Sequence, residues 1–218
     1  MKKIVSILGA RPQFIKAAVL SRIIQEKNEF SEIIIHTGQH FDKNMSEVFF
    51  EEMDIPKPKY NLNINGIGHG AMTGRMLEQI EEVLMDEKPD LVVVYGDTNS
   101  TLAGALAAKK LGVQVAHVEA GLRSFNVSMP EELNRILTDR ISDLLLCPTI
   151  TALSNLKAEG FDNFDAKVVL TGDIMGDSVA YYGSLSPERS AIIEKLSLDN
   201  RKFILATTVI WRSQIATY

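Results

Sequence analysis

The stretch 91-LVVVYGDTNSTLAGALAAKKLGVQVAHVEA-120 decides the fold. It begins and ends with short apolar runs, 91–96 and 113–118, and a helical pattern at 99–112 lies between them. Strands that are apolar on both faces and joined by a helix are typical of a parallel sheet covered on both sides. The stretch therefore predicts one βαβ unit of such a sheet.

The same alternation extends along most of the chain. Further strands are expected at 3–8, 32–37, 143–148 and 167–172, and further helices at 13–27, 71–88 and 131–142. Right-handed crossovers then give a doubly wound α/β domain with a parallel, Rossmann-like sheet. We expect this domain at residues 1–172, connecting helices at 173–200, and at 201–218 the first strand of a second domain (202–207) with an atypical tail.

Composition limits the classes of partner. The 218 residues are 45% hydrophobic and 23% charged, as in ordinary globular proteins, and the formal net charge is −5. No basic run stands out, so neither nucleic acid nor an anionic membrane is the expected partner. No apolar segment reaches the roughly 18 residues of a membrane span, and the apolar run at the amino terminus is too short for a signal peptide. We therefore expect a cytosolic protein.

The sequence also predicts no metal and no cofactor. The single Cys147 excludes an internal disulfide and a cysteine-based zinc site, and no two histidines have metal-ligand spacing. Neither the GxGxxG dinucleotide fingerprint nor the P-loop GxxxxGK[ST] occurs. His36 and His117 lie within expected strands, and we interpret them as core residues.

Charged side chains follow the carboxyl ends of expected strands, where ligands bind in such sheets. Asp97 follows the strand at 91–96, and Glu119 follows the strand at 113–118. If these sequential strands are neighbours, the two carboxylates share one crevice. The alternative for Asp97, or for the adjacent Thr98, is a simple helix N-cap.

Two helix starts add further candidates. Arg11 stands at the start of a helix, where the helix dipole disfavours a cation unless an anion binds there, and Lys16 lies one turn further along. At the second helix start, Glu131 lies in the first turn and Arg135 follows four residues later. Glu131 could merely complement the dipole, and Glu131 and Arg135 could form a plain ion pair.

Together these side chains predict a polar pocket for an anionic substrate with acid–base chemistry. Its carboxylates and cations would be Asp97, Glu119, Glu131, Arg11, Arg123 and Arg135. His40 follows the end of the strand at 32–37 and is a further pocket candidate. His69, within the glycine-rich segment 66–75, suits a substrate loop or a solvent loop equally well.

Five segments, in this order, resemble the non-hydrolysing UDP-N-acetylglucosamine 2-epimerases. They are GARPQFIK (9–16), HTGQHFDKNM (36–45), VYGDTNSTLAGALAA (94–108), HVEAGLRS (117–124) and MPEELNRILTDRISDLLLCPT (129–149). The resemblance covers nearly all of residues 1–207. It implies two Rossmann-like domains facing across a cleft, the GT-B arrangement, of which this chain supplies the first half.

The resemblance also implies a reaction and a set of roles. The reaction inverts carbon 2 of a UDP-2-acetamido sugar, UDP-GlcNAc to UDP-ManNAc, by elimination and re-addition of UDP, and it supplies precursors of surface polysaccharides. Asp97, Glu119 and Glu131 match the acid–base carboxylates. The matching substrate-binding residues are Arg11, Lys16, His40, Arg123 and Arg135. A UDP-sugar substrate and a homodimer are the partners we expect.

The end of the chain departs from the family pattern. The family continues its FILAT strand into a segment whose histidine assists the leaving phosphates, whereas 206-ATTVIWRSQIATY-218 contains no histidine. We therefore expect residues 1–218 alone to be inactive or nearly so. The alternatives are a UDP-2,3-diacetamido-uronate 2-epimerase and a non-catalytic nucleotide-sugar-binding or oligomerisation fragment. HVEAGLR together with PEELNR argues against a glycosyltransferase.

Overall fold

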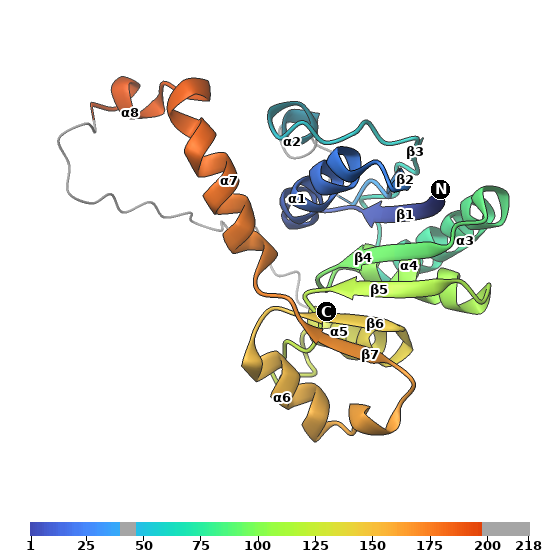
Figure 1. The fold of residues 1–218 in the computed structure, drawn as a ribbon. Helices are drawn as coiled ribbons and strands as arrows, with labels where there is room; N and C mark the ends of the chain where they lie inside the picture. Colours follow the sequence, from blue (N-terminus) through green and yellow to red (C-terminus); the bar gives the residue numbers. More distant parts are fainter. Residues whose placement is uncertain (40–46, 198–218) are drawn as a thin grey trace, which may run out of the picture. The chain divides into compact units, whose positions relative to one another are not determined.

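The computed structural model describes residues 1–39 and 47–197, and its centre is one parallel sheet (Figure 1). The strand order is β3-β2-β1-β4-β5-β6-β7, and every neighbouring pair is parallel. The strands are β1 (Lys2–Leu8), β2 (Phe30–His36), β3 (Tyr60–Asn61), β4 (Leu91–Tyr95), β5 (Gln114–Val118), β6 (Leu144–Cys147) and β7 (Lys167–Leu170). The predicted strand at 202–207 and the candidate His40 lie outside the described residues.

Helices alternate with the strands, which confirms the predicted doubly wound class. They are α1 (Arg11–Lys27), α2 (Glu47–Glu52), α3 (His69–Glu87), α4 (Asn99–Lys110), α5 (Pro130–Ile141), α6 (Ile150–Ala158), α7 (Ile174–Arg189) and α8 (Ile192–Lys195). A short 3₁₀ turn, Phe161–Asn163, precedes β7. The sequence interpretation did not predict β3, α2 and α6, which are two, six and nine residues long.

Helices pack on both faces of the sheet (Figure 1). On one face, buried side chains of α3 and α4 share a core with β1, β4 and β5, and the alanines of α4 lie close to the strands. On the other face, Phe14 of α1 stacks on His36 of β2 at 5.3 Å between ring centroids and contacts Phe50 of α2 at 5.1 Å. His36 is 3% exposed, which confirms its interpretation as a core residue.

The order of the strands reverses between β1 and β4. From β1 the chain moves outward to β2 and β3, and from β4 it moves in the opposite direction to β7. In open α/β sheets such a reversal opens a crevice at the carboxyl ends of the strands, and ligands bind there. The elements that border this point are the start of α1, the end of β4 and the start of α4.

Two compact units divide the chain, residues 1–180 and residues 181–218. The sheet belongs to the first unit, and the described part of the second contains the end of α7 and the short α8. The predicted boundaries near residues 172 and 200 stay a prediction. None of the helices in the described ranges combines the length and the apolar character needed to cross a bilayer.

Glu87, the last residue of α3, connects this helix to β1 and β3. Its carboxylate accepts hydrogen bonds from Lys59 Nζ at 2.5 Å, Tyr60 Oη at 2.6 Å and Lys3 Nζ at 3.0 Å. These three donors lower the pKa of Glu87 to about 2. Since Tyr60 lies in the edge strand β3 and Lys3 in the central strand β1, the carboxylate links both strands to the end of α3.

We predict that Glu87→Gln lowers the midpoint of thermal unfolding at pH 7. The folded-state pKa lies below the ordinary value, so the stabilisation is fully present above about pH 4.5 and is lost as the pH falls toward 2. Melting followed by circular dichroism should therefore show the gap between wild type and variant closing in that window. Glu78→Gln, at an exposed position of the same helix, is the matched control. A gap that does not change with pH would contradict this role.

Candidate active site

The ends of β4 and β5 bring two carboxylates to one edge of the sheet. The strands pair in parallel with Tyr95 opposite Val118, and the Gly96 amide donates to the Val118 carbonyl at 3.0 Å. Asp97 and Glu119 therefore follow neighbouring strands. The strands are neighbours, which is the condition under which the two carboxylates share one crevice.

The backbone at both strand ends lies in the left-handed region. Gly96 has φ of 63° and Glu119 has φ of 75°. Glycine adopts this conformation without strain, but a residue with a β-carbon pays of the order of 1–3 kcal/mol. The amides of Glu119 and Ala120 both donate to the Leu146 carbonyl, at 3.1 and 3.0 Å, and hold the strained turn in place. A glutamate kept in such a conformation points to a function for its side chain.

Lys16 lies against this edge from α1. Its ammonium group forms an ion pair with Glu119 Oε2, and the Lys16 side chain is only 8% exposed. A β-carbon placed on Gly96 would lie 3.4 Å from Lys16 Nζ, so the ammonium also borders the end of β4. Burial lowers the pKa of Lys16, and the negative charges of Asp97 and Asp173 oppose that shift. The structure thus brings together Lys16, Glu119 and Asp97.

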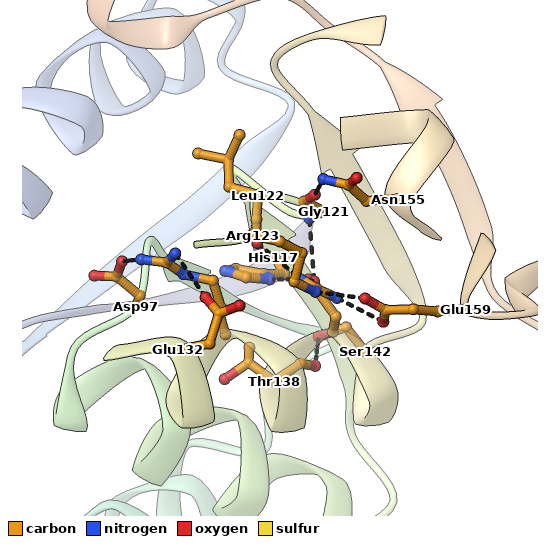
Figure 2. Close-up of polar contacts among 12 residues, drawn as sticks. Asp97, His117, Gly121, Leu122, Arg123, Glu132, Thr138, Ser142, Asn155 and Glu159 are labelled. Carbon is orange, nitrogen blue, oxygen red and sulfur yellow. Dashed lines mark hydrogen bonds and ion pairs between the residues drawn. The ribbon is translucent and has the colours of Figure 1, made fainter. Parts of the chain in front are cut away.

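Asp97 pairs with Arg135 across to α5 (Figure 2). The N-cap of α4 is Thr98, whose hydroxyl accepts from the Thr101 amide at 3.3 Å. Of the two N-cap candidates it is therefore Thr98 that caps the helix, and the carboxylate of Asp97 faces a cation instead. The backbone carbonyl of Asp97 accepts from Asn134 Nδ2 at 2.9 Å, which also fixes the backbone at Asp97.

Arg135 makes its second ion pair with Glu132, Nη1 to Oε2 at 2.9 Å (Figure 2). The partners that the structure gives Arg135 are thus Glu132 and Asp97, so the plain pair with Glu131 considered from the sequence is replaced by these two. Glu132 is 1% exposed and also accepts from the amides of Ser124 and Phe125, at 3.0 and 2.9 Å. Burial alone would raise the pKa of Glu132, but these amides, the Ser124 side chain and the charge of Arg135 together outweigh it and lower that pKa.

Glu131, next to Glu132, is partly exposed in the first turn of α5. Position in the sequence does not separate these adjacent glutamates, since both lie in the first turn. The structure separates them by burial: Glu132 holds the loop before α5, and Glu131 is accessible to solvent. Its predicted acid–base role stays a prediction.

The guanidinium of Arg123 is buried and donates to other groups of the protein (Figure 2). It donates to both carboxylate oxygens of Glu159 at 2.6 and 2.8 Å, to Asp139 Oδ2 at 2.7 Å and to the Leu122 carbonyl at 2.7 Å. The side chain is 1% exposed. This contact set is that of a structural residue, and the predicted substrate contact of Arg123 stays a prediction.

Gln13 fixes the turn that carries Arg11, although no pattern in the sequence marks it as a site residue. Its side-chain oxygen accepts from the amides of Gly9 and Ala10 at 2.8 and 3.0 Å, and its nitrogen donates to the Tyr95 carbonyl at 2.8 Å. The β1–α1 turn is therefore tied to the end of β4. Arg11 is exposed as the first residue of α1, directly at this turn.

His69, at the start of α3, reaches the same edge through Asn99. Its Nδ1 lies 3.1 Å from Asn99 Nδ2, and the Asn99 side-chain oxygen accepts from Asn134 Nδ2 at 3.3 Å. Asn99 and Asn134 thus connect His69 to the backbone of Asp97. Across the described ranges, no three His, Cys, Asp or Glu side chains gather in a way that could hold a metal ion. The expectation of no metal stays a prediction.

Comparisons with known proteins point to one family. The sequence model of the UDP-N-acetylglucosamine 2-epimerases matches residues 22–208. A Pseudomonas aeruginosa relative, UDP-2,3-diacetamido-2,3-dideoxy-D-glucuronate 2-epimerase, is 60% identical over 94% of this chain and 56% of its own length. A UDP-N-acetylglucosamine 2-epimerase from Methanocaldococcus jannaschii is 47% identical over 93% of this chain and 56% of its own length.

A solved structure supports the same assignment. The Methanocaldococcus jannaschii UDP-GlcNAc 2-epimerase, in complex with UDP-GlcNAc and UDP, matches with a TM-score of 0.83 and 48% identity. The match covers 89% of this chain and 52% of that chain. The chain thus spans about half the length of the relatives it matches, and its Rossmann-like sheet corresponds to half of their GT-B fold.

The adjacent glutamates of α5 give a matched pair of variants. We predict that Glu132→Gln lowers the free energy of unfolding by about 1–3 kcal/mol, because buried amides and Arg135 lose a charged acceptor. Glu131→Gln should change it by no more than about 0.5 kcal/mol, as at other accessible positions. Denaturant unfolding of both variants measures the difference. Equal losses would contradict the division of roles.

Proposed function

The chain belongs to the UDP-N-acetylglucosamine 2-epimerase family, and we propose that its first unit carries the acid–base groups of a carbon-2 epimerase. The substrate would be a UDP-2-acetamido sugar, with UDP-GlcNAc and UDP-ManNAc as the pair of epimers. One observation carries the proposal: Asp97 and Glu119 lie at neighbouring strand ends, each paired with a cation.

The chemistry requires such an arrangement. The proton at carbon 2 is weakly acidic, so removing it needs a positioned carboxylate together with a stabilised leaving group. Breaking the bond from carbon 1 to the phosphate oxygen releases UDP as an anion. Inversion then requires that a proton return to carbon 2 from the opposite face while the released UDP adds back to carbon 1, and this proton return needs a second group beside the sugar. Asp97, Glu119 and Glu131 are the groups we propose for these two transfers.

The ion pairs suggest how substrate binding would activate the base. While Lys16 pairs with Glu119, the ammonium stabilises the carboxylate and weakens it as a base. A diphosphate that binds beside Arg11 and Lys16 competes for this ammonium. Glu119 would then be released as a stronger base at the moment when the sugar arrives. Arg135 stands in the same relation to Asp97.

A second substrate has a specific observation in its favour. The Pseudomonas aeruginosa relative with 60% identity is a UDP-2,3-diacetamido-2,3-dideoxy-D-glucuronate 2-epimerase, whereas the Methanocaldococcus jannaschii UDP-GlcNAc enzyme is 47% identical. Both names describe epimerisation at carbon 2, so the carboxylates would act alike. We propose UDP-GlcNAc as the first substrate to test and the diacetamido-uronate as the second. A homodimer, a cytosolic location and a role in polysaccharide supply stay predictions.

The catalytic role of Glu119 predicts a large loss of turnover. In a two-domain relative that carries the HVEAGLRS motif, the substitution equivalent to Glu119→Gln should reduce turnover by roughly 100-fold or more while the fold is retained. The measurement is incorporation of solvent deuterium at carbon 2 of UDP-GlcNAc, followed by NMR. Near-normal exchange in the variant would rule out Glu119 as an acid–base group.

The same assay tests residues 1–218 alone. We propose that they exchange carbon 2 far more slowly than a two-domain relative, since a closed cleft must exclude water and retain UDP while the intermediate exists. The sequence of residues 208–218 has no counterpart of the family's histidine. Exchange at a rate comparable to that of the relative would show that this chain suffices.

A further inference from the structure

A buried hydrogen-bond network that includes His117 links β5, α5 and the end of β4 (Figure 2). His117 lies in β5 with 0% exposure, which confirms its interpretation as a core residue. Its Nδ1 lies 2.7 Å from Asp139 Oδ1, and its Nε2 lies 2.7 Å from the Gly96 carbonyl oxygen. The imidazole thus connects α5 to the residue that precedes Asp97.

Both partners of the ring can only accept. A backbone carbonyl has no proton, and Asp139 is a carboxylate that also accepts from the Gly121 amide at 3.1 Å and from Arg123 Nη1 at 2.7 Å. Burial alone would raise the pKa of Asp139, but His117 and Arg123 outweigh it and lower that pKa. Because the Gly96 carbonyl has no proton, the 2.7 Å contact with Nε2 of His117 is a hydrogen bond only if that ring nitrogen is the donor.

The contact between His117 and the Gly96 carbonyl lies next to Asp97 and affects the direction of its side chain. Gly96 is left-handed, and its amide is fixed by the Val118 carbonyl at 3.0 Å. His117 fixes the Gly96 carbonyl, which belongs to the peptide that joins Gly96 to Asp97. The plane of that peptide sets the direction in which the Asp97 side chain leaves the backbone. Lys16 Nζ borders the same glycine.

We propose that His117, oriented by Asp139, is a positioning residue for Asp97: by donating Nε2–H to the Gly96 carbonyl it holds the peptide that directs this carboxylate. The effect on catalysis rests on the proposed epimerase function, whereas the contact between His117 and the Gly96 carbonyl is independent of it. Asp139 serves as the fixed end of the network, since its other oxygen holds the loop after β5 at Gly121.

The state of the ring is the first test, on the 218-residue chain labelled with ¹⁵N. Long-range NMR correlations of His117 should show a proton bonded to Nε2, because this nitrogen donates to the Gly96 carbonyl. A bare Nε2 would overturn the proposal, since the Gly96 carbonyl would then have no donor in the ring. This arm requires neither substrate nor activity.

The second test uses two variants that affect opposite sides of Asp139. In His117→Asn the amide nitrogen replaces ring Nδ1 and can still donate to Asp139, but it is too short to reach the Gly96 carbonyl. The control Glu159→Gln changes the partner of Arg123 and leaves the contact between His117 and Gly96 intact. Equivalent substitutions are made in a two-domain relative that carries both the HVEAGLRS and the PEELNRILTD motif.

The expected result is a loss in kcat of roughly 10- to 100-fold for His117→Asn with KM changed less than about threefold, because misdirecting a catalytic group slows chemistry more than binding. Glu159→Gln should keep both constants within about twofold. An unchanged kcat in folded His117→Asn, or an equal loss in Glu159→Gln, would overturn the positioning role. If the unsubstituted relative does not epimerise either UDP-sugar, the proposed function fails, and the ring-nitrogen measurement still decides the contact.

Discussion

The site depends on two left-handed residues at the ends of neighbouring parallel strands. Gly96 follows β4 and Glu119 follows the neighbouring strand β5, and at each of these residues the chain turns away from the sheet at the same edge. Parallel pairing places the two turns side by side, and the backbone conformation determines where the side chains of Asp97 and Glu119 point. The cost of the left-handed conformation falls on Glu119, which has a β-carbon, and the Leu146 carbonyl holds that turn.

Cations from two helices complete this arrangement. Lys16 of α1 pairs with Glu119, and Arg135 of α5 pairs with Asp97, so each carboxylate has a cation from a different helix. Lys16 is almost fully buried, and such a cation is stable only while a carboxylate or another anion lies next to it. In this state Glu119 supplies the negative charge. In the proposed reaction the phosphates of a UDP-sugar would supply it instead.

The fold was predictable because its signals are local. Apolar runs and helical patterns of ordinary length located the long strands, and the crossover rule gave their parallel pairing. β3 and α2 were missed because two and six residues are too short to show a period. The placement of Asp97 and Glu119 at one edge followed from the neighbouring strands that carry them, and Thr98 took the N-cap role that the sequence left open.

The supporting residues were not predictable from the same signals, because their partners are far away in the sequence. Gln13 bonds to residues that are 82 and 88 positions away in the sequence. The Asp139 carboxylate contacts residues that lie 16 to 22 positions earlier, in β5 and in the loop after it. Glu132 and Glu131 are equivalent in a helical pattern, and only the loop that folds over Glu132 distinguishes them. Arg123 is a cation near a strand end by sequence, but the acids that surround it appear only in three dimensions.

In the proposed function, the edge formed by β4, β5 and the start of α1 binds a UDP-sugar. The most direct measurement is a titration of the ¹⁵N-labelled 218-residue chain with UDP-GlcNAc, followed by amide chemical shifts. We expect the largest shift changes to cluster at residues 9–16, 96–99 and 118–121, and we expect UDP alone to reproduce those at residues 9–16. Binding with its largest changes elsewhere on the sheet, or no change at millimolar ligand, would contradict this proposal.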